Sequence, residues 1–287
     1  MIENPVIRQL GIVGTGRVAR ALARGLGVRS QAPALIWGRA RLKRQEAAER
    51  GGCSAAESLE AMVEACDVVA VAVADDAIAE IAGQIAEAGM AEGSLVFHVS
   101  GGTGTGVLDP LRNGGALTAA IHPAMTFTGD PQLEVARMAG ACFAITGSSP
   151  EATRRARLIV EALGGTPIEI AETQRALYHA ALCHAANHLV TMFDGASRML
   201  RAAGVEEPSA VLAPLARAAL DNSIAQGFGA LSGPILRGDA NTIRDHLAAL
   251  AIDCPEVLPA YRAMALATVS ALGDTDAARA VRSLLDE

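Results

Sequence analysis

Two histidines of this 287-residue sequence stand where an imidazole could deliver a proton to a bound molecule. His122 precedes Pro123 at the end of an apolar run, and His179 lies in a long stretch of helical composition. An unperturbed imidazole has a pKa of about 6.5, which suits general acid catalysis at neutral pH. For His122, a structural role in holding a turn weighs about equally. Both residues are candidate proton donors.

The stretch 172–204 carries further polar residues at helical spacing. With about 100° of rotation per helical residue, Asn187 lies about 80° from His179, so the two share a face. His184 and His188 lie about 140° and 180° from His179 and form an i,i+4 pair, which could bind a metal. No third ligand has suitable spacing. We therefore expect histidines of a core or a subunit interface, and no metal site.

Three other polar positions are candidates for contact with a substrate. Ser100 and Gly101 end an apolar run, at the sheet edge where doubly wound proteins bind ligands. An ordinary strand-end turn is the alternative for this pair. Arg237 could clamp a carboxylate with two hydrogen bonds, although a salt bridge with Asp239 is slightly favoured. The predicted catalytic residues are thus His179, Asn187, His122 and Ser100, and the predicted substrate-binding residues are Gly101 and Arg237.

A glycine pattern, G-x-x-G-x-G-x-x-A, lies where the first apolar run turns into the first helical stretch. Its members are Gly11, Gly14, Gly16 and Ala19. Glycine permits a sharp turn there and lets backbone N–H groups approach a pyrophosphate at the helix N-terminus. A tight turn without a ligand is the less favoured alternative, because the pattern follows a predicted strand and opens a predicted helix.

The residues that follow the apolar run 34–38 are basic, although the chain has a net charge of -7. NAD enzymes commonly place Asp or Glu here, to bind the ribose 2′-hydroxyl. This chain places Arg39 and Arg41, whose guanidinium groups can fork onto the 2′-phosphate of NADP. A solvated helix face is the alternative, and it suits Lys43 and Arg44 better. The expected cofactor is NADP(H), bound by Gly11, Gly14, Thr15, Gly16, Arg17, Val18, Arg39, Arg41, Ala74 and Asp75.

The predicted secondary structure that positions these residues changes near Ala171, from alternating strands and helices to helices alone. Before it, strands are expected at 6–14, 34–38, 66–75, 94–102, 115–123 and 141–147. Helical stretches alternate with them, which predicts an α/β fold with a doubly wound, mostly parallel Rossmann sheet. After it, helices are expected at 172–204, 208–226, 239–251, 255–272 and 274–286. We expect an NADP-binding Rossmann domain at 1–170 and an all-α substrate and dimerisation domain at 171–287.

Composition narrows the class of protein. Hydrophobic residues make up 51% of the chain, which is enough for a sizeable core. The negative net charge argues against broad nucleic-acid binding, which needs an extended basic surface. No apolar run approaches the ~20 residues of a membrane span, and the N-terminus shows no signal-peptide pattern. Five scattered cysteines suit reduced thiols. We expect a cytoplasmic protein with a small-molecule substrate and no nucleic-acid or membrane partner.

Six segments together resemble the Rossmann-like oxidoreductases with a C-terminal helical domain of unknown function. They are GIVGTGRVA, VAVADDAI, HVSGG, IHPAMTF, YHAALCHAANHLV and LSGPILRGD. This family is related to hydroxyacid dehydrogenases, ketopantoate reductases and pyrroline-5-carboxylate reductases. Its second domain resembles the C-terminal domain of 6-phosphogluconate dehydrogenase. The resemblance implies an NADP-dependent reductase of a small carbonyl or imine, with a ketopantoate-like substrate as a candidate. It also implies a homodimer built by the helical domain, for which we expect His184 or His188 near the interface.

One departure from the related hydroxyacid dehydrogenases concerns the proton donor. Those enzymes often carry Lys-x-x-x-Asn on the equivalent helix, whereas here Cys183 precedes Asn187 by four residues. Lys43 is the only lysine of the chain, so another group must supply the proton if a carbonyl is reduced, and His179 and His122 are the candidates. A non-catalytic NADP-binding sensor or interaction protein is the alternative. An F420-dependent NADP oxidoreductase is a further one.

Overall fold

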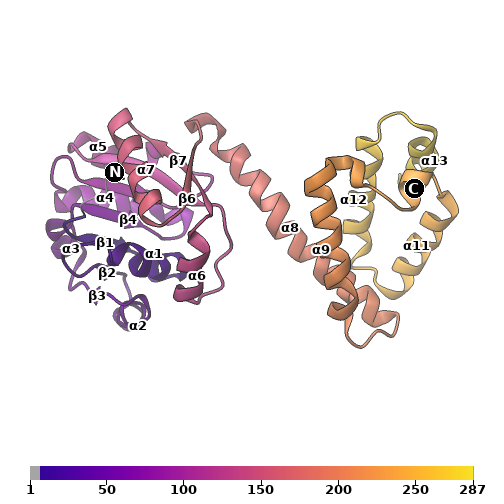
Figure 1. Cartoon of the computed structure of the whole chain (residues 1–287), viewed down its shortest axis with the longest axis horizontal. Coiled ribbons are helices and arrows are strands. Elements are labelled where there is room, and N and C mark those ends of the chain that lie inside the picture. Colours follow the sequence, from indigo (N-terminus) through magenta and orange to yellow (C-terminus); the bar gives the residue numbers. More distant parts are fainter. Residues whose placement is uncertain (1–6, 287) are drawn as a thin grey trace. The chain divides into compact units, whose positions relative to one another are not determined.

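The computed structural model describes residues 7–286, which fall into two compact units. The first unit extends to Leu182 and the second begins at Cys183, so the division falls within one helix. In Figure 1 the first unit is the body that contains the sheet, and the second contains the helices α9 to α13. The functional boundary expected between residues 170 and 171 stays a prediction.

An eight-stranded sheet forms the centre of the first unit. The strand order is β3-β2-β1-β4-β5-β6-β7-β8, and every neighbouring pair is parallel except β6 with β7. The strands are β1 (Leu10–Val13), β2 (Leu35–Trp37), β3 (Ser54–Ala55), β4 (Val68–Val71), β5 (Leu95–His98), β6 (Leu117–Pro123), β7 (Cys142–Gly147) and β8 (Thr166–Glu169). The predicted doubly wound, mostly parallel sheet is confirmed.

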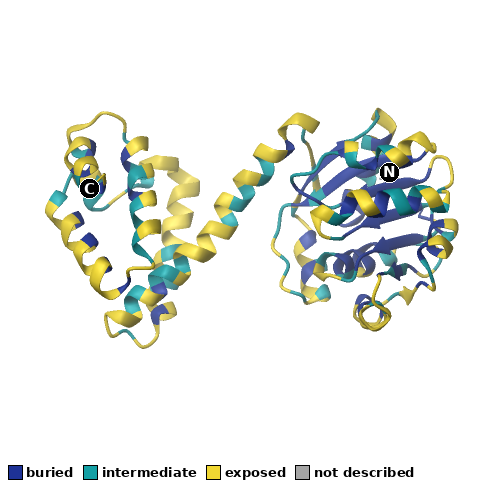
Figure 2. Cartoon of the chain, turned by 180° about the vertical axis from the view of Figure 1, so that it is seen from behind, coloured by how far each residue is buried: buried dark blue, intermediate teal, exposed yellow. Residues whose placement is uncertain are grey.

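Helices cover both faces of this sheet. One apolar cluster joins it to α1 (Arg17–Gly27), α2 (Arg41–Gly51), α6 (Pro131–Met138) and α7 (Pro150–Ala162). The other joins it to α3 (Leu59–Ala65), α4 (Ile78–Ala88) and α5 (Asp109–Asn113). Along β4, Val68 and Ala70 belong to the first cluster and Val69 and Val71 to the second, as the alternation of a strand requires. Both faces of the central strands β1, β4 and β5 are therefore buried (Figure 2).

The second half of the chain is helical, as predicted. Its elements are α8 (Arg175–Ala202), α9 (Pro208–Gln226), α10 (Pro234–Arg237), α11 (Ala240–Asp253), α12 (Leu258–Ala271) and α13 (Asp276–Leu285). A small core that includes Ile243, Val269 and Val281 joins α11, α12 and α13. Among residues 7–286, no helix combines the length and the apolar character needed to cross a membrane.

Candidate functional site

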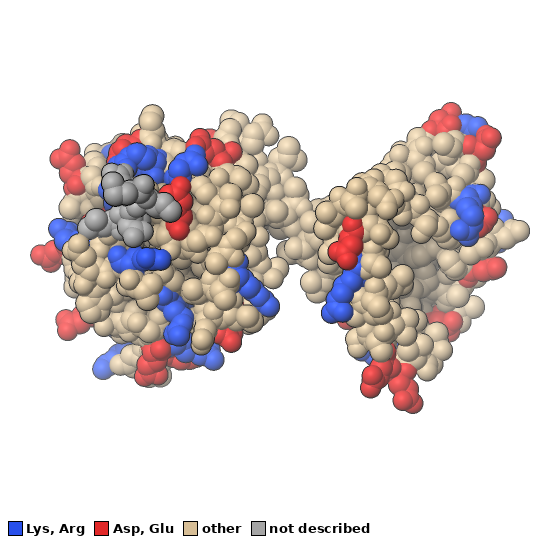
Figure 3. Space-filling model, in the orientation of Figure 1, with Lys and Arg blue, Asp and Glu red and all other residues tan. Residues whose placement is uncertain are grey.

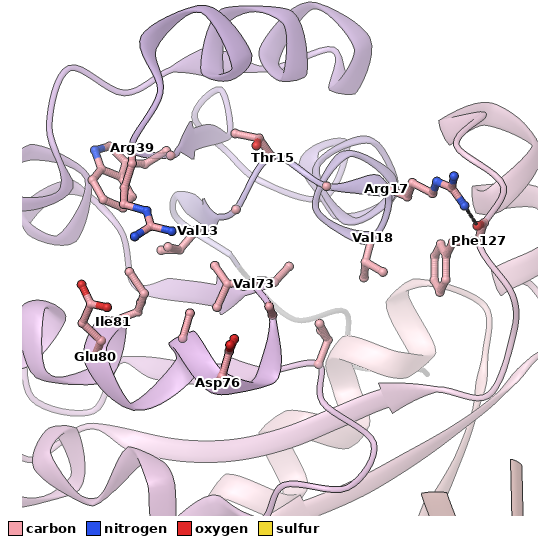
Figure 4. Close-up of a pocket in the computed structure, with 18 residues that line it drawn as sticks. Val13, Thr15, Arg17, Val18, Arg39, Val73, Asp76, Glu80, Ile81 and Phe127 are labelled. Carbon is pink, nitrogen blue, oxygen red and sulfur yellow. Dashed lines mark hydrogen bonds between the residues drawn. The ribbon is translucent and has the colours of Figure 1, made fainter. Parts of the chain in front are cut away.

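A cavity of about 560 Å³ lies at the carboxyl ends of β1, β2 and β4, where a doubly wound sheet binds its ligands. Its walls come from the glycine turn after β1, the end of β2 and the segment after β4 (Figure 4). Most of the residues that the sequence assigns to a cofactor contribute to these walls: Gly14, Thr15, Gly16, Arg17, Val18, Arg39 and Ala74.

Two glycines shape the turn after β1. Gly14 has a φ of 126°, and a Cβ atom on it would lie 2.1 Å from the carbonyl oxygen of Ala72. Only glycine fits there, because L side chains avoid this φ and the obstacle is backbone. Gly16 opens α1, and the space where its Cβ would stand is empty within 4 Å. No side chain caps this helix and no acidic residue lies in its first turn, so its N–H groups can receive an anion.

The ends of the cavity carry different groups (Figure 4). Arg39 follows β2 at one end, exposed to solvent. At the other end, Nη1 of Arg17 donates a hydrogen bond to the carbonyl oxygen of Phe127 at 2.9 Å. The guanidinium of Arg17 is thus engaged by the loop after β6. Arg17 thus contributes to this end of the cavity with its side chain as well as with its backbone N–H.

Three residues assigned to the cofactor do not line the cavity. Gly11 is buried within β1, and a Cβ on it would meet Sγ of Cys66 at 3.0 Å. Its lack of a side chain therefore serves close packing of the sheet against α3. Arg41 begins α2 and is exposed. Asp75 also stands outside the walls of the cavity, and its carboxylate accepts a hydrogen bond from the hydroxyl of Ser100.

A group of polar side chains lies beyond the ends of β4, β5 and β6, in the first unit. The hydroxyl of Ser100 donates to Oδ2 of Asp75 at 2.7 Å. Nδ1 of His122 lies 3.1 Å from the hydroxyl oxygen of Tyr178, and the rings of His122 and His179 have centroids 5.6 Å apart. The structure thus brings together the predicted residues Ser100, His122 and His179 with Asp75. We call these four residues and Tyr178 the polar cluster.

The backbone at Gly101 lies directly against both imidazoles. A Cβ on Gly101 would stand 2.5 Å from Cδ2 of His179 and 2.9 Å from Nε2 of His122. A Cβ on Gly102 would stand 3.2 Å from Nδ1 of His179. The two glycines therefore let the strand-end loop approach the histidines at a distance that no side chain permits. This places the predicted substrate residue Gly101 beside both candidate proton donors.

The environment of His122 favours its neutral form. Burial lowers the pKa of His122 to about 4, and the neighbouring His179 and Arg175 act in the same direction. Burial also raises the pKa of Tyr178, so its hydroxyl keeps its proton at neutral pH. When the hydroxyl of Tyr178 donates to Nδ1 of neutral His122, the ring hydrogen lies on Nε2. That nitrogen is the one beside Gly101.

Two family models match the chain. Residues 2–123 match a Rossmann-like domain, and residues 141–268 match a domain of unknown function, DUF2520. The two matches show a Rossmann-like domain followed by a DUF2520 domain. A comparison with curated proteins finds no match.

Solved structures resemble nearly the whole chain. A Bacteroides fragilis protein assigned as an NADP oxidoreductase is 23% identical with a TM-score of 0.75, over 93% of this chain and 99% of that one. The Aspergillus terreus reductive aminase in complex with NADPH and ethyl-5-oxohexanoate is 18% identical with a TM-score of 0.69, over 96% and 99%. The Myxococcus stipitatus imine reductase in complex with NADP+ is 16% identical with a TM-score of 0.68, over 97% and 100%. These likenesses establish the fold.

Other predicted residues fall in the second unit, within the DUF2520 match. Asn187 and Cys183 lie on α8 beyond Leu182. Arg237 forms a salt bridge with Asp239 at 2.8 Å, which is the arrangement that the sequence slightly favours. The predicted i,i+4 pair is exposed, with the Nδ1 atoms of His184 and His188 3.0 Å apart. Within residues 7–286, no three His, Cys, Asp or Glu side chains gather as metal ligands do.

Sequence reasoning missed Tyr178. It is one of only two tyrosines in the chain and stands beside His179, on a segment already singled out for chemistry. Its position next to His179 is the feature of the sequence that could have indicated a role for Tyr178. Its contact with His122, 56 positions earlier, follows only from the packing of α8 against the end of β6.

Proposed function

We propose that this DUF2520 protein is an NADP(H)-dependent oxidoreductase that transfers a hydride to or from a small oxo acid, hydroxy acid or imine. A ketopantoate-like molecule is a candidate substrate. The observation that carries the proposal is the neighbourhood, in one unit, of the cavity at β1, β2 and β4 and the polar cluster beyond β5 and β6. The complexes of the two similar reductases with NADPH and NADP+ support the choice of cofactor.

The residues of the cavity fit a phosphorylated dinucleotide. The turn at Gly14 and Gly16 leaves open space before the uncapped N-terminus of α1, which suits a pyrophosphate. Arg39 suits the 2′-phosphate at the end of β2, and Arg41 stays a predicted second contact. NADPH, when bound, supplies the hydride. Ala74 and Asp75 then lie between the cofactor and the polar cluster, in the segment that follows β4.

The polar cluster suits proton transfer and substrate orientation. His179 is our proton donor, because the neutral state of His122 makes that ring a poor acid at neutral pH. His122 then orients the substrate through Nε2–H, and Ser100 is fixed by Asp75. Among residues 7–286, the N–H groups of Gly101 and Gly102 find no hydrogen-bond acceptor, so they can hold a substrate oxygen. Asn187 and Arg237 remain predicted contacts from the helical domain.

Cofactor preference tests the first half of this proposal. The protein should bind NADPH roughly tenfold or more tightly than NADH, because a charge-assisted hydrogen bond from Arg39 contributes about 1.5–3 kcal/mol. Trp37 is the only tryptophan and lines the cavity, so its fluorescence reports binding of either nucleotide. Arg39→Ala should remove most of the preference and leave NADH binding nearly unchanged. Arg29→Ala, an exposed arginine outside the cavity walls, is the matched control. Equal affinities of the wild type for the two nucleotides would refute the assignment of Arg39.

A homodimer through the helical domain is the second part of the proposal. α9 exposes a row of large apolar side chains, among them Leu215 at 63% and Ile224 at 77% (Figure 2). In Figure 3 uncharged residues cover most of the visible surface of the helical unit. Exposed apolar surface of this extent marks an association site. Light scattering should show a dimer at micromolar concentration, and Ile224→Glu should shift it toward monomer, whereas Glu256→Gln, an exposed polar change on the same unit, should not. A monomeric wild type would contradict this part.

The proposal includes a cytoplasmic location, which the sequence predicts. All five cysteines, at positions 53, 66, 142, 183 and 254, are free thiols in the structure. Reduced thiols are typical of that compartment.

A further inference from the structure

Arg175 is fully buried, although arginine almost never is unless its charge is compensated. It is the first residue of α8. Its Nε donates to the carbonyl oxygen of Thr103 at 2.7 Å, and its Nη2 donates to the carbonyl oxygen of Ser100 at 2.7 Å. Nη1 donates to Oγ1 of Thr146 on β7 at 3.0 Å. One guanidinium therefore holds the backbone on both sides of Gly101 and Gly102.

Glu172 holds the other half of the same loop. It stands one helical turn before Arg175, at the start of the 3-10 helix Glu172–Gln174. Its Oε2 accepts from the N–H of Thr105 at 3.0 Å and from the hydroxyl of Thr105 at 3.1 Å, and its Oε1 accepts from the N–H of Gly106 at 3.3 Å. Burial raises the pKa of Glu172, but these hydrogen bonds and the charge of Arg175 together outweigh it, and the pKa lies below its usual range. The carboxylate is thus charged where it binds the loop.

The glycines of the loop 100–106 make this grip possible. A Cβ on Gly104 would stand 1.9 Å from Oε1 of Glu172, and Gly101 has the same relation to the histidine rings. The sequence GGTGTG thus lacks side chains where the loop faces Glu172, His122 and His179. The loop is rich in glycine because it packs closely against residues at the start of α8.

We propose that Arg175 and Glu172 are positioning residues: together they fix the loop 100–106 so that Ser100, Gly101 and Gly102 face His122 and His179 in a reactive arrangement. This inference rests on the function proposed above. A planar guanidinium with several N–H donors can hold Ser100, Thr103 and Thr146 at once, whereas the single ammonium of lysine cannot reproduce that fork.

Arg175 also places a fixed positive charge near His122. The charged and titratable groups around His122 are Arg175, Tyr178 and His179 from α8, Asp75 after β4 and His98 on β5. Burial is the largest influence on the pKa of His122; the arginine and the two histidines lower that pKa further, and Asp75 raises it. Removal of the charge at position 175 should therefore raise the pKa of His122, which a purely mechanical support would not do.

Hydrogen exchange and histidine titration test the proposal on the full-length protein without a substrate. In Glu172→Gln, the amides of Thr105 and Gly106 should exchange roughly tenfold or more faster, since each loses a charged acceptor. The amides of the central strand residues Val69 and Val96 should keep their protection. Glu169→Gln, which changes an exposed carboxylate of the same unit, is the matched control. Equal acceleration of loop and strand amides would show a general loss of stability and overturn the proposal, as would an unchanged loop.

Two substitutions of Arg175 separate charge from geometry. Arg175→Met should raise the pKa of His122 by roughly one unit, measured by NMR of its ring protons, while Arg175→Lys should keep most of the charge effect. Both should speed amide exchange in the loop 100–106. If Arg175→Met does not fold, Arg175→Lys and Glu172→Gln still test the proposal. Amides of the loop 100–106 that exchange at the wild-type rate in both variants would show that Arg175 and Glu172 do not fix the loop. A wild type that does not bind NADPH would refute the proposed function but not this proposal, since amide exchange and the titration of His122 are both measured without the nucleotide.

Discussion

His179→Ala should slow turnover by roughly a hundredfold to ten-thousandfold, as expected for the loss of a general acid. The ring of His179 lies against Gly101 and Gly102, where a substrate oxygen or nitrogen would be held. The chain has no lysine besides Lys43, and the neutral state of His122 disfavours it as a donor. NADPH binding should barely change, because His179 does not line the cavity. NADPH oxidation with a panel of 2-oxo acids and cyclic imines measures kcat.

Two further variants show whether a loss of kcat in His179→Ala reflects the loss of a proton donor. His184→Ala removes an exposed imidazole from the same helix and should leave kcat nearly unchanged. His122→Ala should lower kcat less than His179→Ala, because we assign it orientation rather than proton transfer. The opposite order, with full kcat in His179→Ala and a large loss in His122→Ala, would move the donor to the end of β6. If both variants keep full kcat, the hydroxyl of Ser100 or a water molecule becomes the donor.

The absence of turnover would carry its own meaning. If the wild type binds NADPH tightly but oxidises it with none of these substrates, the protein is better described as a non-catalytic NADP-binding sensor or interaction protein. Hydride exchange with F420 would be the next reaction to test, because it needs the same NADP site and a different partner.

The cavity was within reach of sequence reasoning because its determinants are local. The turn Gly14 to Gly16 follows directly on β1, and Arg39 lies two residues after the end of β2. Parallel pairing of β1 with β2 then brings both segments to one edge of the sheet. Gly11 fits the same glycine pattern but faces α3. A spacing pattern cannot show which face of a strand a glycine serves.

The contacts of Arg175 and Glu172 with the loop 100–106 could not be predicted from the sequence, because their determinants are not local. Arg175 and Ser100 are 75 positions apart, and Glu172 and Thr105 are 67 apart. Nothing in their local spacing indicates that they meet, because their contact depends on the antiparallel pairing of β7 with β6 and on where α8 begins. The missed strands β3 and β8 are different: β3 has only two residues, and β8 is short and mostly exposed, so neither forms an apolar run.

Acid should destabilise the first unit through His98, a buried residue that no part of the proposed chemistry uses. His98 is fully buried at the end of β5. Its Nδ1 accepts from the N–H of Ser100 at 3.2 Å, and its Nε2 lies 2.9 Å from the carbonyl oxygen of Gly104. These two bonds fit only the neutral tautomer with hydrogen on Nε2. A proton on Nδ1 would displace the N–H of Ser100 and disturb the loop.

The sign of the effect follows from proton binding. The pKa of His98 is lowered from 6.5 to about 4, and burial is the main cause. Arg175 acts in the same direction, while the bond to Gly104 and the charges of Asp75 and Glu172 act against it. Between these two pH values the unfolded chain binds a proton at this site and the folded chain does not. The free energy of unfolding should therefore fall as the pH drops through this window. One such proton corresponds to about 1.4 kcal/mol per pH unit.

Urea unfolding at a series of pH values in that window measures this dependence, with Trp37 fluorescence reporting on the first unit alone. His98→Gln should reduce the slope of the unfolding free energy against pH by about 1.4 kcal/mol per pH unit near pH ~5, since one titrating site is gone. Phe97→Leu, from the neighbouring position of the same strand, should lower stability at every pH without a change of slope, because it removes packing and no titrating group. Equal slopes for the wild type and His98→Gln would mean that the folded protein accepts a proton at His98 as readily as the unfolded chain. The two backbone bonds would then not hold the ring of His98 neutral.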